Sequence, residues 1–176
     1  NGFDNITSIG GQHLTNKGDD DVRSIISSGP TSLNVPRIFC DKFVNLESVY
    51  FLLFNIERID MNSFWNCKNL ITLDLHMNQI AVVDQVAFVN AIKLTRLDLR
   101  QNRITDLPGI VFWSSSNLTI LNLEGNLLST LNPNLFTRLP SLRYLYMQSN
   151  QIEVLPDRIF ANLTRLVHID LDNNKL

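Results

Sequence analysis

The chain has 176 residues, of which 44% are hydrophobic and 18% are charged. This composition is sufficient for a sizeable core and excludes a disordered chain, and the length favours one domain. Its 15 lysines and arginines stand against 17 acids, which gives a net charge of -2. Because a nucleic-acid-binding surface needs clustered basic residues, we expect no nucleic-acid partner.

The longest apolar runs are short, such as 49–54. A membrane-spanning helix needs about 20 apolar residues, so we expect no membrane span in this chain. The chain begins at Asn1 without a leader sequence. We therefore expect that a signal peptide has been removed or that the start was trimmed.

Residues 1–21 fit no part of the repeating pattern that begins further along the chain. They contain the steps Gly10–Gly11 and Lys17–Gly18 and the acidic run 19–21. We expect a flanking cap here, with an edge strand around 6–9.

Residues 22–45 predict a degenerate first coil. Its apolar positions are Val22, Ile25, Val35, Phe39 and Phe43. The pair Val35–Pro36 resembles Leu-Pro pairs that occur later, at 107–108 and 155–156.

From residue 46 the chain repeats at a constant interval without insertion, and each repeat starts with a leucine: Leu46, Leu70, Leu94, Leu118, Leu142 and Leu166. Apolar residues follow three and five positions later. Asparagine then occupies one fixed position in all but the first repeat, at Asn78, Asn102, Asn126, Asn150 and Asn174. The pattern Leu-x-x-Leu-x-Leu-x-x-Asn-x-Leu is the signature of the leucine-rich repeat.

This pattern predicts an α/β solenoid: a right-handed coil with a curved parallel sheet on its concave face and loops, 3-10 turns or short helices on its convex face. Alternate strand leucines point inward because side chains alternate faces along a strand. The solenoid is expected over 22–176, with regular repeats starting at 46, 70, 94, 118 and 142 and a truncated repeat at 166. The asparagines are expected to satisfy backbone groups in the turn, and the phenylalanines 64, 88, 112, 136 and 160 to fill the convex half.

The pattern breaks at both ends of the repeat region. Phe54 occupies the asparagine position and Asn55 comes one residue late, which predicts a distorted turn or a coil covered by the N-terminal segment. At the other end, Leu166, Ile169 and Leu176 have no following coil to face. Since solenoids need caps, we expect a fragment of a longer protein or an end covered by a partner, such as a second copy in a dimer.

Cys40 and Cys67 fall in adjacent coils on the convex side, at positions three residues apart. A disulfide is compatible with this spacing, and the alternative is two small buried thiols. We expect no metal here, because two thiols have no neighbouring histidine.

Three glycosylation sequons occur, at Asn5, Asn117 and Asn162. The last two lie on loops that lead into strands. Together with a disulfide, they favour secretion.

Candidate binding residues come from strand positions expected to face outward on the concave side. The residues between the two strand leucines include Asp74, Asp98 and Tyr146, and the flanking positions complete the candidate set with His76, Arg96, Arg100, Tyr144 and Gln148. The polar members can form a solvated lattice of ion pairs or a strip that recognises a partner's charges. Tyr144 and Tyr146, beside Ile120, form an aromatic spot of the kind found at interface hot spots.

Two other features of this face have structural interpretations. A metal bound by Asp74, His76 and Asp98 is the least favoured interpretation, so no metal is expected. An apolar patch of Tyr50, Leu52, Leu53 and Met77 is expected to be covered by the N-terminal cap or to contact a partner.

No catalytic constellation is evident. His13, His76 and His168 stand apart in the repeat, and no Gly-rich phosphate loop is present. Trp65 and Trp113 are expected to pack on the convex surface. We therefore expect neither enzymatic activity nor a cofactor.

Residues 46–176 resemble the typical repeats of extracellular leucine-rich repeat proteins such as Toll and Toll-like receptor ectodomains. The segments 35–39 and 63–70 are most similar to the leucine-rich repeat immune proteins of mosquitoes and related insects. The resemblance implies a secreted or receptor-borne module that binds proteins or microbial products. For the mosquito proteins it also implies disulfide-linked and complement-like partners, but the C-terminal cysteines and coiled coil that carry such assembly are not in these residues.

The sequence thus favours a non-enzymatic recognition module of innate immunity that binds through its concave strand face. An adhesion or developmental-signalling ectodomain is one alternative. An intracellular enzyme inhibitor or scaffold is a second, which reduced thiols and unmodified sequons would favour.

Overall fold

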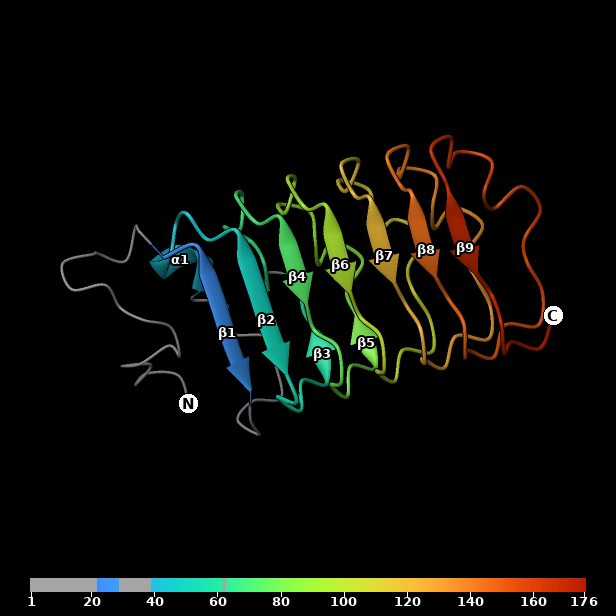
Figure 1. Cartoon of the computed structure of the whole chain (residues 1–176), viewed down its shortest axis with the longest axis horizontal. Helices are drawn as coiled ribbons and strands as arrows, with labels where there is room; N and C mark the ends of the chain where they lie inside the picture. Colours follow the sequence, from blue (N-terminus) through green and yellow to red (C-terminus); the bar gives the residue numbers. More distant parts are fainter. Residues whose placement is uncertain (1–21, 29–38, 62) are drawn as a thin grey trace.

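The repeats stack as successive coils, each adding one strand to a single parallel sheet, in a computed structural model that describes residues 22–28, 39–61 and 63–176 (Figure 1). The strands lie in the order β1-β2-β4-β6-β7-β8-β9. Their bounds are β1 Ser24–Ser28, β2 Ser48–Leu52, β4 Thr72–Asp74, β6 Arg96–Asp98, β7 Ile120–Asn122, β8 Tyr144–Tyr146 and β9 His168–Asp170. The predicted solenoid with a parallel sheet is confirmed.

The return path of each coil contains little regular structure. Strands β3 (Arg58–Ile59) and β5 (Val82–Val83) form a separate parallel pair. Helix α1 (Phe39–Lys42) is the one helix among the described residues. The convex side is therefore built mainly of turns.

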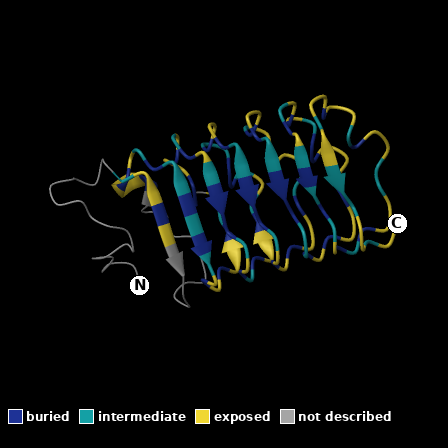
Figure 2. Ribbon diagram, in the orientation of Figure 1, coloured by how far each residue is buried: buried dark blue, intermediate teal, exposed yellow. Residues whose placement is uncertain are grey.

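Strand pairing follows the period of the repeat. Leu73 lies beside Leu97, which lies beside Leu121, and the same pairing continues through β8 and β9. The leucines at 73, 97, 121 and 145 are fully buried, and dark blue bands mark buried positions along the strands in Figure 2. Burial of each aliphatic side chain contributes about 1.5–3 kcal/mol, so this ladder stabilises every junction between the coils it spans.

A second ladder, of phenylalanines, fills the convex half of the core. The ring centroids of Phe64 and Phe88 are 5.9 Å apart, those of Phe88 and Phe112 are 6.2 Å apart, and those of Phe136 and Phe160 are 6.0 Å apart. The interplanar angles of these pairs are 20° or less. The predicted convex core positions are thus confirmed.

The asparagines form a ladder of hydrogen bonds between coils. Asn126 donates through Nδ2 to the carbonyl oxygen of Leu123 in its own coil and to that of Leu99 in the preceding coil, both at 3.0 Å. Its Oδ1 accepts the N–H of Ile104 at 3.1 Å. The equivalent bonds recur at Asn78, Asn102, Asn150 and Asn174. The predicted structural role of this column is confirmed.

One residue per coil, directly before the asparagine position, has a left-handed backbone. The column is Leu53, Met77, Gln101, Gly125, Ser149 and Asn173, with φ between 54° and 63°. In the repeat that starts at Leu46, Asn55 also has a positive φ of 55°, so the turn at Phe54 is distorted as predicted. Phe54 is buried and its ring lies 5.2 Å from that of Phe51, while its N–H donates to Asn78 Oδ1 at 3.0 Å.

The described part of the first coil follows the repeat. Strand β1 pairs with β2 in the register of the later strands, with Ile25 beside Val49. Ile25, Cys40 and Phe43 are buried, so they continue the core of the stack. The expected cap at 1–21, its edge strand at 6–9 and the Val35–Pro36 pair lie outside the described residues.

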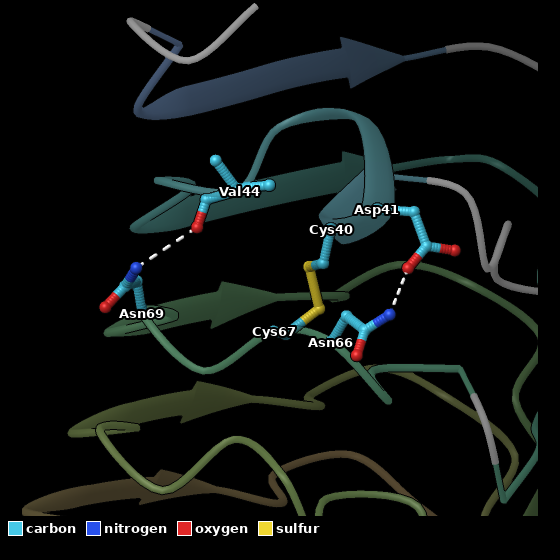
Figure 3. Close-up of a disulfide and its surroundings, with 6 residues drawn as sticks. All are labelled: Cys40, Asp41, Val44, Asn66, Cys67 and Asn69. Atoms are coloured by element: carbon cyan, nitrogen blue, oxygen red, sulfur yellow. Dashed lines mark hydrogen bonds between the residues drawn. A yellow bond between two sulfur atoms is a disulfide. The ribbon is translucent and has the colours of Figure 1, made fainter.

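A disulfide joins Cys40 in α1 to Cys67 in the following coil, with a Cα–Cα distance of 5.0 Å (Figure 3). On either side of it, Asn66 Nδ2 donates to Asp41 Oδ1, and Asn69 Nδ2 donates to the carbonyl oxygen of Val44 at 3.1 Å. The predicted disulfide is confirmed, and two hydrogen bonds support the same junction between coils.

The last coil is less buried than those before it. Leu166, Ile169 and Leu171 are half-buried against the core, and Leu176 is 59% exposed. Pairing of two copies through this coil stays a prediction. Among the described residues, no helix has the length and apolar character that crossing a bilayer requires.

Candidate functional site

The residues between the two strand leucines form a column across the sheet, and its members on β4, β6 and β7 are not open to solvent. Asp74 is 8% exposed, Asp98 is 1% exposed and Asn122 is 7% exposed. The expectation that these side chains are accessible to a ligand is therefore wrong. Parallel strands lie about 4.8 Å apart, so neighbouring side chains cover these short ones.

A local hydrogen bond explains why short polar residues recur in this column. Asp98 Oδ1 accepts the N–H of Arg100 at 3.2 Å, and Asn122 Oδ1 accepts that of Glu124 at 3.0 Å. Asp74 and Asp170 make the same bond to the residue two positions later. The column thus satisfies backbone donors where each strand ends.

Five candidate residues come together as an acid–arginine cluster on β4, β6 and the residues just after them: Asp74, His76, Arg96, Asp98 and Arg100. His76 Nδ1 lies 2.6 Å from Asp74 Oδ1. Asp98 Oδ2 lies 3.3 Å from Arg96 Nη2 and 3.7 Å from Arg100 Nη1. The arginine side chains are 41% and 36% exposed, so they are the accessible part of the cluster.

The electrostatics of this cluster centre on Asp98. Burial, followed by the negative charge of Asp74, raises the pKa of the Asp98 carboxyl above its ordinary value. The hydrogen bond from the Arg100 N–H and the charges of Arg100 and Arg96 oppose this rise without cancelling it. The ionised form of Asp98 is therefore less favourable in the folded chain than in the unfolded chain.

Replacing Asp98 with asparagine should raise stability at pH 7. Asparagine retains the acceptor for the Arg100 N–H, as Asn122 does in the next coil, and it removes a desolvated charge. Because the folded-state pKa of Asp98 is raised, the folded chain binds this proton more readily than the unfolded chain. Wild type should therefore gain stability as pH falls through that pKa, and Asp98→Asn should not share this gain.

Urea midpoints of both proteins at pH 7 and pH 4.5 measure the effect. The converse change, Asn122→Asp, is the matched control and should lower stability at pH 7. If the urea midpoint changed by the same amount between the two pH values in wild type and in Asp98→Asn, a raised pKa of Asp98 would be contradicted.

The same cluster contains donors of a type that can ligate a cation. Ligand atoms of Asp74, His76 and Asp98 all lie within 4.8 Å of one another. The charges of Arg96 and Arg100 beside Asp98, however, disfavour another cation at this place. The absence of a metal site stays a prediction.

A second group, the tyrosine patch, lies on β7, β8 and β9 and consists of Ile120, Tyr144, Tyr146 and His168. The rings of Tyr146 and His168 are 5.3 Å apart, and the guanidinium of Arg143 lies 5.9 Å from the Tyr144 ring. The patch is only partly buried. Strand β7 separates its tyrosines from the arginines on β6, so the candidate residues form two groups instead of one.

Two of the histidines contact other residues of the candidate groups. His76 contacts Asp74, and His168 packs on Tyr146. The signal for His168 was available, since it lies one repeat after Tyr144 in the same column. Gln148, another candidate, has its Oε1 buried without a hydrogen-bond partner among the described residues.

The sequons differ in what the structure shows. Asn117 and Asn162 are exposed. Their Nδ2 atoms donate to the carbonyl oxygens of Ile92 at 2.9 Å and Thr137 at 3.4 Å, respectively. Asn5 lies outside the described residues.

The two tryptophans lie on the convex side, where they were expected. Trp65 is 55% exposed and Trp113 is 54% exposed. The guanidinium of Arg138 covers the Trp113 ring at 4.1 Å from its centroid.

Comparison with known proteins identifies the repeat independently. Family models described as "Leucine rich repeat" and "Leucine Rich repeats (2 copies)" match residues 92–152 and 140–176. No curated protein sequence is significantly similar to the chain. Significant structural similarity extends to 330 chains of solved structures, so the fold by itself does not discriminate among functions.

Two solved structures are informative. The leucine-rich repeat domain of APL1, a mosquito immune protein, is 31% identical, with a TM-score of 0.71 over 74% of this chain and 34% of that chain. Toll, in its complex with Spätzle from Drosophila, is 19% identical, with a TM-score of 0.57 over 88% of this chain and 27% of that chain. This chain therefore spans about a third of the length of these relatives or less. The second likeness shows the fold alone.

Proposed function

We propose, since this chain is a leucine-rich repeat protein, that it is a non-enzymatic recognition module which binds a protein ligand across the concave face of its sheet. The observation that carries the proposal is the tyrosine patch. Its two tyrosines and one histidine come from adjacent strands, β8 and β9, and remain partly accessible. Aromatic side chains of this kind are enriched among the residues that dominate binding energy.

The charges on either side of the patch define what such a ligand presents. Arg96 and Arg100 lie in and just after β6, on the N-terminal side of β7. In and just after β7, β8 and β9, the charged side chains are acidic, at Glu124, Asp170 and Asp172. The cations Arg143 and Arg165 come before β8 and β9, at the edge where these strands begin. The face is thus polarised along the sheet, and it suits a ligand with an acidic surface over the arginines and a basic surface over the acids.

The proposed setting is extracellular. The disulfide between Cys40 and Cys67 favours an oxidising compartment, and exposed sequons at Asn117 and Asn162 are compatible with N-linked sugars. The disulfide and the sequons disfavour the alternative of an intracellular inhibitor or scaffold. The likeness to APL1, an immune protein, favours a role in innate immunity over adhesion or developmental signalling.

Replacing Tyr144 and Tyr146 together with alanine should weaken ligand binding by more than about 2 kcal/mol, or roughly 30-fold, without unfolding the chain. The ligand for this measurement is the protein that co-purifies with wild type from extracellular fluid of the source organism, isolated and titrated against each variant by calorimetry.

Trp65→Ala is the matched control, because it removes an exposed aromatic side chain from the convex side. It should leave the affinity unchanged. Equal affinity of wild type and the double tyrosine variant would remove the patch from the interface, and loss of binding in the tryptophan variant would move the interface to the convex side.

A further inference from the structure

A groove runs along the edge of the sheet at which the strands begin, next to the loops at the upper side of Figure 1. Its volume is about 520 Å³. Five consecutive coils contribute residues to it, from Ile71 just before β4 to Arg165 just before β9. The groove is therefore long in the direction of the solenoid axis, and it adjoins the tyrosine patch at Arg143, which lies over the Tyr144 ring.

The charged residues of the groove are all of one sign. Lys93, Arg143 and Arg165 line it, and none of its lining residues is acidic. All three cations are exposed. Among the described residues none of them forms a salt bridge: Lys93 Nζ donates to the neutral Asn69 Oδ1 at 2.8 Å, and Arg143 lies over Tyr144. In a chain with a net charge of -2, this is a local excess of positive charge.

The cations are spaced along a line by the repeat itself. Lys93 and Arg165 occupy the same position in coils three repeats apart, and Arg143 comes from the coil next to that of Arg165. Three strand spacings of about 4.8 Å separate the first and last by roughly 14 Å. An anion that contacts all three must therefore be a polymer or an extended chain.

The remaining lining residues indicate which polymer fits. Between the cations lie the hydroxyls of Thr95, Thr119 and Ser141. Thr95 and Thr119 donate to backbone carbonyl oxygens at 3.2 Å and 2.9 Å, so their own oxygens are left to accept hydrogen bonds. No lining residue is aromatic, whereas proteins that bind single-stranded nucleic acids stack bases on aromatic rings.

We propose that this edge binds a linear sulfated polysaccharide that runs along the solenoid axis. Its sulfates pair with Lys93, Arg143 and Arg165, and its sugar hydroxyls donate to the threonines between them. Asn117 lies in the middle of the groove, so an N-linked sugar at this sequon would compete with the polymer for the same space.

The test uses the chain produced in the bacterial periplasm, where disulfides form and N-linked sugars are not added. A fluorescently labelled heparin decasaccharide is the probe, and its binding is followed by polarisation at several salt concentrations. Wild type should bind with an affinity that falls as salt rises. Arg143→Gln with Arg165→Gln should weaken binding about tenfold or more and flatten the salt dependence.

The control removes the same charge from the opposite edge. Arg103→Gln with Lys175→Gln changes two exposed cations that share one position in their coils and lie outside the groove. It should leave the affinity within about twofold to threefold of wild type. Equal losses of affinity in both double variants would show that only the net charge matters, and this would overturn the proposal. The absence of binding by wild type would overturn it as well.

Single-stranded DNA of matched charge provides the remaining comparison. Weaker binding than to the decasaccharide is expected from the lack of aromatic side chains in the groove. Equal or tighter binding would replace the polysaccharide with a nucleic acid and contradict the proposal.

Discussion

Replacing Asn126 with alanine should lower the free energy of unfolding by about 3–5 kcal/mol, because several buried backbone groups lose their partner together. The carbonyl oxygens of Leu99 and Leu123 and the N–H of Ile104 all bond to this one amide. Asn126 is 3% exposed, so water cannot readily replace it. Urea unfolding followed by circular dichroism measures the change.

Asn174→Ala is the matched control at the end of the same ladder. Asn174 makes equivalent bonds to Met147, Leu171 and Ile152, but it is only partly buried. Solvent can satisfy the groups it leaves, so the loss should be about 1–2 kcal/mol. If the two variants lost the same stability, burial of the ladder would not be the source of the effect.

Removing the disulfide should lower stability by about 3 kcal/mol, because it constrains a loop with a sequence separation of 27 residues. The change is Cys40→Ala with Cys67→Ala, measured by urea unfolding. Reduction of wild type with dithiothreitol should reproduce it.

The loss should also be local. Each coil of a solenoid contacts only its neighbours, and Cys40 lies in α1 at the N-terminal side of the stack. Hydrogen exchange should therefore accelerate in β1 and α1 and remain slow in β6 and β7. Uniform acceleration along the sheet would show instead that the coils unfold as one unit.

Much of the fold could be predicted because each position of the repeat recurs in several coils. Paired residues in β2 through β9 stand one full repeat apart along the chain, as the leucine spacing required. The asparagine and phenylalanine ladders followed from the same alignment, which also placed Cys40 and Cys67 in adjacent coils but left open whether they form a disulfide. A residue type that recurs at one position of the repeat indicates that this position has the same surroundings in every coil.

The accessibility of the candidate site could not be predicted in the same way. A period of two in a strand shows which side of the sheet a residue takes, but not how completely its neighbours cover it. Asp98 faces away from the aliphatic core and is nevertheless 1% exposed, since Arg96, Arg100 and Asp74 surround its carboxylate. Contacts such as that of Tyr146 with His168 depend on ring orientation, which no spacing in the sequence specifies.

The left-handed column has a consequence for how a coil acquires its shape. Gly125 is the only glycine in it, and the other positions hold leucine, methionine, glutamine, serine and asparagine. A side chain in this conformation costs roughly 1–2 kcal/mol, so most of these turns would adopt another backbone conformation in an isolated repeat. We expect the neighbouring coils to hold each turn in its left-handed conformation. A single isolated repeat should therefore remain unstructured until it packs against a folded repeat.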